Sequence, residues 1–335
     1  MPGPAHRRPG APRPAGRHGG GLVGGRYALT TALRQDPGGG LYLARDTVGG
    51  GEVVVRQARV RREAGRAGLA ARGALRREAA LLAHLDGHRV APRPLHLVEQ
   101  EDALFLVRER VAGRSLGEWV AGRRGEDGRV GVPWAEARPL ALALVDLIDR
   151  ARAQGLVLLD LSPDHLVVRP DGGVRLTALE LTAEAGAPAD PFAPIPVRPG
   201  VPGYRPPARI PRPTGPRPLH GCAEGLRHGA DLYALGGLFF LLATGHDPLL
   251  GEGLPHAPPL LDRLGRWLAL AARGGGTAAE LGRLALDLRE LSPDRRRSLA
   301  GIRAALTAGA PAPPTRRTPL PRTPGTPAAT AVTGP

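Results

Sequence analysis

Two residue types are missing from this sequence. Lysine and asparagine do not occur among its 335 residues, so all 46 side chains counted as lysine or arginine are arginine. An arginine presents a planar, delocalised charge, and it does not replace the compact ammonium of lysine. Chemistry that needs a lysine ammonium or an asparagine carboxamide at one fixed point is therefore excluded.

Cysteine, aromatic residues and long apolar runs are also scarce. The single cysteine, Cys222, has no second thiol to pair with and no metal-ligand spacing around it, which fits a reducing compartment. The longest apolar run, residues 232–245, is shorter than a bilayer span, and the N-terminus lacks the apolar stretch of a signal peptide. We expect a cytoplasmic protein without a membrane span, whose core consists mainly of leucine, valine and alanine.

Both ends of the chain are basic and rich in proline, glycine and alanine. Residues 1–25 hold four arginines and residues 309–335 hold three, with no acid in either segment, against a net charge of +15 for the chain. Such segments bury too little apolar surface to fold, so both are predicted to be disordered tails. An arginine-rich adaptor for RNA or DNA is one hypothesis, but without lysine or interleaved aromatic residues we do not expect a nucleic-acid partner.

The folded part begins with strand patterns. The β-favouring runs YALTTAL, GGGLYLARD and GEVVVRQA are separated by glycine clusters, and RPLHLVEQ and ALFLVRERV follow later. Between the two groups, Leu75, Ala79, Leu82 and Leu85 recur at helical spacing, with Glu78 on the same stripe. A carboxylate on an inward face needs a partner.

Beyond Gly113 the pattern becomes mainly helical. An amphipathic helix through Leu140 and Ala151 stops at Gly155, and a loop with Asp160 at its centre leads into the predicted hairpin HLVV–PDGG–VRLTAL. A very apolar helix is predicted from Asp231, and further helices reach about residue 306. The sequence therefore predicts an α+β fold, with a small antiparallel β lobe that carries one main helix and a larger, mostly helical lobe.

In this order, the signals resemble a bacterial Ser/Thr protein kinase domain over residues 26–308. The resemblance rests on Glu78 in the helix after a VVVR strand, on DLSP at residues 160–163 before a hairpin, and on GVPGY followed by DLYALGG. DLSP and the string ALE at 178–180 look most like the kinase-like domain of class III lanthipeptide synthetases. The resemblance implies a two-lobed kinase-like fold, with an N-lobe at 26–112 and a C-lobe at 113–308.

The resemblance also assigns catalytic positions, and three of five carry an unsuitable residue. Kinase phosphoryl transfer uses a strand lysine held by a helix glutamate, a base, and magnesium ligands supplied by an asparagine and an aspartate. The corresponding residues here are Arg56, Glu78, Asp160, His165 and Ala178. Arg56 can satisfy Glu78 without serving ATP, a histidine is a poor magnesium ligand, and an alanine offers no ligand.

The nucleotide-binding positions are altered as well. Three adjacent glycines, Gly38, Gly39 and Gly40, stand where spaced glycines normally cover the phosphates; they permit close backbone approach, but a plain hairpin turn explains them equally well. The backbone at Glu109 and Val111 is expected to face the base. Arg108 borders the adenine pocket, and its guanidinium either folds outward or fills the pocket.

One metal arrangement could survive. Glu180 shares a strand face with Ala178, so it could bind a metal ion together with Asp160 and Asp164, although an acid at a strand end is more often solvated.

The segment at residues 183–203 contains no serine, threonine or tyrosine, which excludes phosphorylation switching there. Ala208 replaces a glutamate that would pair with Arg296.

These features favour a pseudokinase, a kinase-fold protein without phosphotransfer that acts as a scaffold or regulatory partner of another protein. On this hypothesis ATP and Mg²⁺ bind weakly or not at all. The alternative is an active ATP-dependent Ser/Thr kinase or phosphotransferase, a transferase that uses Arg56, Asp160 and Glu180 in shifted roles.

Overall fold

The computed structural model describes residues 13–14, 22–36, 38–59, 65–123, 131–179, 182–184, 201, 203–206, 224–248, 257–289 and 297–308. Most of the two predicted tails lies outside these ranges, as do Cys222, Glu180, Ala208 and Arg296. Within the described part, no helix is both long and apolar enough to cross a membrane.

The first half of the chain forms one antiparallel sheet. Its strands are β1 (Arg13–Pro14), β2 (Tyr27–Asp36), β3 (Gly39–Asp46), β4 (Glu52–Arg59), β5 (Pro94–Gln100) and β6 (Ala103–Glu109), in the order β1-β2-β3-β4-β6-β5. Each predicted β run became one strand of this meander. The short β1, inside the predicted N-terminal tail, pairs with Thr31 and Ala32 of β2.

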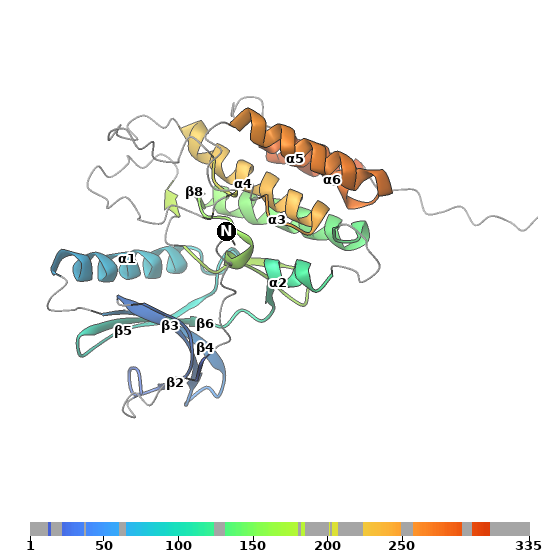
Figure 1. Cartoon of the computed structure of the whole chain (residues 1–335). Coiled ribbons are helices and arrows are strands. Elements are labelled where there is room, and N and C mark those ends of the chain that lie inside the picture. Colours follow the sequence, from blue (N-terminus) through green and yellow to red (C-terminus); the bar gives the residue numbers. More distant parts are fainter. Residues whose placement is uncertain are drawn as a thin grey trace, which may run out of the picture.

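One helix, α1 (Gly65–His84), lies along one face of this sheet (Figure 1). Its leucines Leu75 and Leu82 are buried with Leu104 and Leu106 of β6, in a core that also includes residues of the helical lobe. Leu75 and Leu82 are seven residues apart, or about two helical turns, so they point the same way. The predicted inward stripe is therefore present, with Glu78 on it at 2% exposure.

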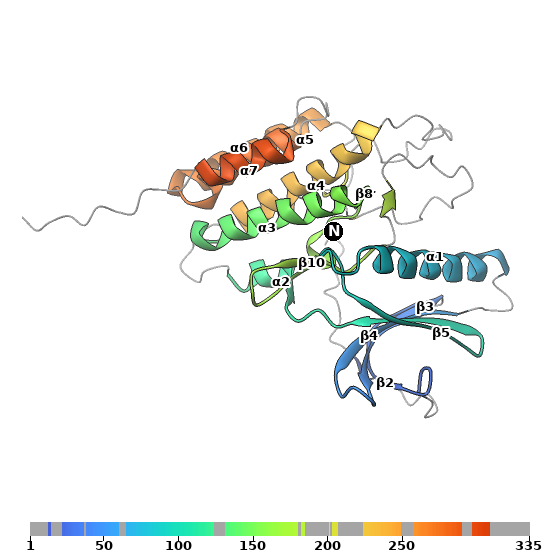
Figure 2. The same ribbon diagram turned by 180° about the vertical axis from the view of Figure 1, so that it is seen from behind.

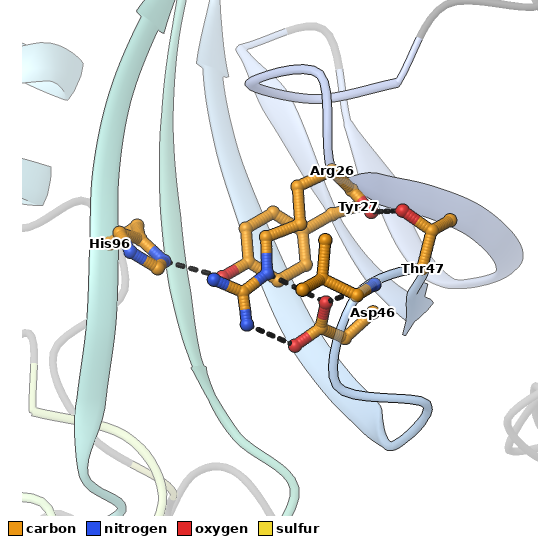
Figure 3. A network of polar contacts seen from close by, with 6 residues as sticks. Arg26, Tyr27, Asp46, Thr47 and His96 are labelled. Atoms are coloured by element: carbon orange, nitrogen blue, oxygen red, sulfur yellow. Dashed lines mark hydrogen bonds and ion pairs between the residues drawn. The ribbon is translucent and has the colours of Figure 1, made fainter.

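On the other face of the sheet, residues from near its two opposite edges are in contact. Strands β2 and β5 stand near opposite edges of the sheet, yet the Tyr27 hydroxyl is hydrogen-bonded to Nδ1 of His96, and the Gly24 amide donates to Oε1 of Gln100 at 2.8 Å. Figure 3 shows the Tyr27–His96 contact together with the neighbouring ion pair. A strongly curled sheet thus encloses a small second core that contains Tyr27, Tyr42 and Val55.

A bidentate ion pair fixes the end of the hairpin between β2 and β3. Nε and Nη2 of Arg26 donate to the two carboxylate oxygens of Asp46 at 2.7 and 2.6 Å, and Thr47 Oγ1 donates to the Arg26 carbonyl at 2.7 Å (Figure 3). The hydrogen bond from Arg26 holds the pKa of Asp46 well below its usual range. The carboxylate is thus kept ionised at a strand end.

The second half of the chain is mostly helical, with two small sheets. Its helices are α2 (Leu116–Ala121), α3 (Trp134–Ala153), α4 (Glu224–Thr244), α5 (Ala257–Ala271), α6 (Thr277–Leu288) and α7 (Leu299–Ala308). Helices α3, α4 and α6 pack side by side, α5 lies against α6, and α7 covers α3 (Figure 2). Of its short strands, β7 (Arg114–Ser115), β9 (Leu166–Val168) and β10 (Val174–Leu176) form a three-stranded sheet, and β8 (Leu156–Val157) pairs with β11 (Ala183–Glu184).

Two sequence predictions for this half can be compared with the structure. The hairpin predicted around PDGG is present, since β9 and β10 pair antiparallel with Val168 opposite Val174. The apolar helix predicted from Asp231 begins earlier, because α4 starts at Glu224. Glu, Leu, Arg and Ala in residues 224–230 favour the helix, so Asp231 lies inside it instead of at its N-terminus.

The predicted α+β, two-lobed kinase-like fold is confirmed. The sheet with α1 forms the smaller lobe, and α2 to α7 form the larger lobe (Figure 1). One continuous apolar core runs from Ala58, Leu82 and Leu106 in the sheet lobe to Leu158 and Leu235 in the helical lobe. The hairpin of β9 and β10 lies at the junction, where the candidate site is found.

Candidate functional site

The inward-facing carboxylate of α1 meets a guanidinium from the sheet. Arg56 on β4 has Ala58 as its i+2 neighbour, and because alternate strand residues share a face, both point toward α1. Nη1 of Arg56 forms an ion pair with Oε2 of Glu78, whose side chain is 2% exposed. The structure therefore pairs the residue at the phosphate-lysine position with the helix glutamate.

A second guanidinium reaches the same carboxylate from β6. Arg108 is 6% exposed, and its Nη1 lies 3.4 Å from Oε1 of Glu78. The same nitrogen donates to the backbone carbonyl of Thr177 at 2.6 Å, one residue before Ala178. The sequence left two orientations open for Arg108, and the structure shows that its guanidinium folds inward.

Arg108 thus connects three segments of the cleft. It extends from the strand that leads to the hinge, contacts the main helix of the smaller lobe, and bonds the chain just after β10 in the larger lobe. A charged side chain this deeply buried is stable only with such partners. Both oxygens of Glu78 face a guanidinium, one from Arg56 and one from Arg108.

The loop that carries Asp160 has an unusual backbone. Leu159 has a φ of +63°, in the left-handed region that leucine rarely adopts, and the Asp160 amide donates to the Leu158 carbonyl at 2.8 Å. Asp231 on α4, 1% exposed, holds this turn: its carboxylate oxygens accept from the amides of Leu158 and Leu159 at 3.0 and 2.8 Å. Asp231 therefore fixes the turn that presents Asp160.

Asp160 and His165 are directly in contact. Nδ1 of His165 lies 3.1 Å from Oδ2 of Asp160 and 3.2 Å from its backbone carbonyl. The His165 carbonyl in turn accepts from the amide and hydroxyl of Thr177, at 2.8 and 3.1 Å. The residue at the asparagine position thus supports the base-position aspartate and the strand β10 side of the cleft.

The described residues contain no group of three or more His, Cys, Asp or Glu side chains that could hold a metal ion. Ala178, at the aspartate position, is described and supplies no ligand. Glu180, the predicted substitute, lies outside the described residues, so its role stays a prediction. Magnesium prefers oxygen ligands. Of the assigned positions in the described part, Asp160 and Glu78 carry carboxylates, and both oxygens of Glu78 face guanidinium groups.

The three adjacent glycines sit in the hairpin between β2 and β3. Asp36 pairs with Gly39 across a two-residue loop, and Gly39 and Gly40 already belong to the β3 ladder opposite Ala58 and Gln57. A Cβ at Gly39 would collide with the Gln57 carbonyl, and one at Gly40 would lie 2.6 Å from the Tyr42 hydroxyl. Strand packing thus accounts for Gly39 and Gly40 without a phosphate, and Gly38 lies in the turn.

The predicted hinge follows β6. Glu109 ends this strand, and its amide donates to the Arg93 carbonyl at 2.9 Å, while Val111 two residues later is half-buried. Both residues are placed at the junction of the lobes, on the same segment as Arg108. Whether their backbone meets a nucleotide base stays a prediction.

A buried arginine in the larger lobe was not predicted from the sequence. Arg289, 1% exposed, follows α6 and donates to the Gly203 carbonyl at 2.6 Å and to the Tyr233 hydroxyl at 2.9 Å. Burial lowers the pKa of Arg289. Gly203 belongs to GVPGY, so Arg289 anchors the end of this segment to α4. The available signal was an arginine next to Leu288, at the end of an apolar helical stripe.

Known proteins support the kinase-like reading of this fold. The chain is 34% identical over 178 residues to a probable SapB synthase of Streptomyces coelicolor, which covers 48% of the chain and 18% of that protein. It is 29% identical over 263 residues to CBL-interacting protein kinase 19 of rice (Oryza sativa subsp. japonica), which covers 76% of the chain and 47% of the kinase. CBL-interacting protein kinase 4 of rice is 26% identical over 84% of the chain and 57% of its own length. No family model matches the sequence.

The chain therefore spans 18% to 57% of the length of these relatives. The sequence similarities and the two-lobed architecture together support a protein-kinase-like domain. They do not extend to the catalytic state, since the similarity is modest and the assigned positions differ in the residues described above.

Proposed function

We propose that this protein is a pseudokinase, a kinase-like domain that binds another protein as a scaffold or regulator and does not transfer phosphate from ATP. The observation that carries this proposal is Arg108. Its buried guanidinium lies between Glu78 and the Thr177 carbonyl, where the resemblance places the wall of the adenine pocket.

Electrostatics supports the proposal. Kinases hold the polyanion ATP with a strand lysine that a helix glutamate positions and with metal ions that neutralise its charge. Here Arg56 replaces that lysine and shares Glu78 with Arg108, so turning the bulkier guanidinium of Arg56 toward a phosphate would weaken a buried ion pair. His165 and Ala178 offer no oxygen ligand from their side chains to replace the usual metal site.

The fold-holding elements of the site are nevertheless kept. Asp231 caps the loop of Asp160, and Leu159 retains a strained φ that persists only where its surroundings impose it. A rigid two-lobed surface without turnover suits a binding role. We extend the proposal to a protein partner and a cytoplasmic location.

The decisive experiment measures ATP binding and phosphate transfer together. Thermal shift and calorimetric titration with ATP, each with magnesium, with manganese and with EDTA, are expected to show no metal-dependent stabilisation. Incubation with radiolabelled ATP and a generic protein substrate is expected to show no transfer above a no-enzyme control.

The alternative function, an active phosphotransferase that uses Arg56, Asp160 and Glu180, predicts the opposite. Magnesium-dependent stabilisation by ATP, together with transfer that is abolished by Asp160→Ala and retained by the exposed-turn variant Asp86→Ala, would establish it and remove the pseudokinase proposal.

A further inference from the structure

A cluster of guanidinium groups lies on the hairpin of β9 and β10. Arg169 follows β9 and Arg175 lies on β10, whose antiparallel register places Arg175 opposite Val167. The Arg169 amide donates to the Gly173 carbonyl at 2.8 Å, so the ladder continues and Arg169 shares the face of Val167 and Arg175. The opposite face, with Val168 and Val174, is buried in the main core.

Helix α3 brings a third guanidinium to this hairpin. Arg150 lies in the last turn of α3, and α3 packs against β10 (Figure 2). Burial is the first cause that lowers the pKa of Arg175, followed by the positive charges of Arg169 and Arg150. The like charges are therefore close enough to oppose one another.

Carboxylates only partly balance this cluster. Asp171 pairs with Arg169 at 3.2 Å, and Asp171 and Glu109 are the acids that act on Arg175. Neither Arg150 nor Arg175 forms an ion pair with any residue in the part of the chain that the structure describes. A like-charged group of this kind is destabilising unless an anion offsets it.

The hydrogen-bonding capacity of the cluster is also incomplete. Arg175 is 8% exposed, and its one hydrogen bond within the described residues runs from Nη1 to the Val174 carbonyl at 3.1 Å. Nε of Arg150 is buried without a partner in the described structure. Buried N–H groups of an arginine are normally hydrogen-bonded, so this arrangement lacks acceptors as well as negative charge.

We propose that Arg150, Arg169 and Arg175 form a binding site for a phosphoryl-type oxyanion. A planar guanidinium matches a tetrahedral oxyanion through paired N–H···O bonds, and two guanidiniums without a carboxylate partner suit a ligand with several charged oxygens. The oxyanion is either free phosphate or a phosphorylated side chain of a partner. This proposal does not depend on the pseudokinase proposal.

The test compares a double variant with a charge-matched control. Arg150→Gln with Arg169→Gln removes two cluster guanidiniums, and the buried Arg175 is left in place so that the fold is kept. The control is Arg297→Gln with Arg303→Gln. Arg297 pairs with Asp287, and Arg303 pairs with Asp146 and Asp149. Both proteins carry the same net charge.

Binding is measured by calorimetry with inorganic phosphate and with a phosphoserine peptide, each at constant ionic strength. The cluster variant is expected to lose affinity about tenfold or more for whichever ligand binds, whereas the control keeps it. Tighter binding of phosphate identifies a small oxyanion as the ligand, and tighter binding of the phosphopeptide over its unphosphorylated form identifies a phosphorylated partner.

Asp171→Asn provides an independent readout. It removes the carboxylate that competes for Arg169 while an amide oxygen can still accept from the Gly173 amide, so phosphate affinity is expected to rise. Equal affinity in the cluster and control variants, or no binding of either ligand tighter than about 1 mM, would overturn the proposal.

Discussion

At the residue scale, Arg108 ties together three segments that are distant in the sequence. Replacing it by methionine keeps much of the apolar stem but leaves the partly buried Thr177 carbonyl without its guanidinium donor and removes one of the charges beside Glu78. We expect Arg108→Met to lower the free energy of unfolding by about 2–4 kcal/mol, since an uncompensated buried polar group is costly. Urea denaturation measures the change.

Arg110→Met is the matched control for this variant. Arg110 lies two residues along and pairs with Glu52, but both side chains are about half exposed. A surface ion pair contributes at most about 1 kcal/mol, so the control is expected to lose little stability. Equal losses in the two variants would contradict the structural role given to Arg108.

The ion pair of Arg26 and Asp46 makes a pH-dependent prediction. The hydrogen bond from Arg26 lowers the pKa of Asp46 in the folded protein, so this carboxylate stabilises the fold at a pH above its unfolded pKa of about 4. The contribution is lost as the pH falls below that value toward the lower folded-state pKa. Asp46→Asn is therefore expected to lower Tm at pH 7 and to lower it less at pH 3.

Scanning calorimetry at these two pH values measures the difference. Glu52→Gln, in the exposed pair with Arg110, is the control and is expected to change Tm little at either pH. A Tm loss in Asp46→Asn that is the same at pH 7 and pH 3 would show that the carboxylate charge does not provide the stabilisation.

At the scale of elements, close packing at the hairpin between β2 and β3 accounts for its glycines. Gly39 has no room for a Cβ because the Gln57 carbonyl of β4 occupies that space. We expect Gly39→Ala to separate β3 from β4 locally and to lower the free energy of unfolding by about 1–3 kcal/mol. Gly51→Ala is the control, because a Cβ there meets nothing within 4 Å and is expected to change stability by less than about 0.5 kcal/mol. Similar values for the two variants, from chemical denaturation, would contradict this packing.

Most strands and helices of the fold could be predicted from the sequence, but some pairings and boundaries could not. Strands β2 to β6, helix α1 and the hairpin of β9 and β10 follow from local patterns of apolar residues and turns. The pairing of β1 with β2 was not predicted, because two residues of a proline-rich segment carry no strand pattern of their own. The start of α4 was placed too late, because the strongly apolar pattern begins only at Asp231 whereas α4 begins at Glu224.

Within the site, the sequence predicted that Glu78 is paired, but it did not predict the direction of the Arg108 side chain. An acid on an apolar helical stripe requires a partner, the kinase resemblance named Arg56 as that partner, and the structure contains this pair. The direction of the Arg108 side chain depends on space and on acceptors supplied by Glu78 and Thr177, which come from different lobes. Such non-local information is absent from any single stretch of sequence.

At the scale of the whole molecule, the two lobes share one apolar core. Leu82 and Leu106 of the sheet lobe belong to the same buried cluster as Leu158 and Leu235 of the helical lobe. We therefore expect the lobes to unfold together, with a ratio of calorimetric to van't Hoff enthalpy of about 1 in scanning calorimetry. Two resolved transitions would show that the lobes are independent units.

The inward turn of Arg108 also decides which chemical probes could occupy the cleft. Inhibitors that mimic adenine present neutral donors and acceptors, and they would have to cover or displace a buried guanidinium that such a ring cannot satisfy. Arg108 already faces Glu78 and donates to the Thr177 carbonyl, so an adenine mimic would enter only at the expense of these contacts. Collections assembled against ATP sites are accordingly expected to yield few ligands of this fold.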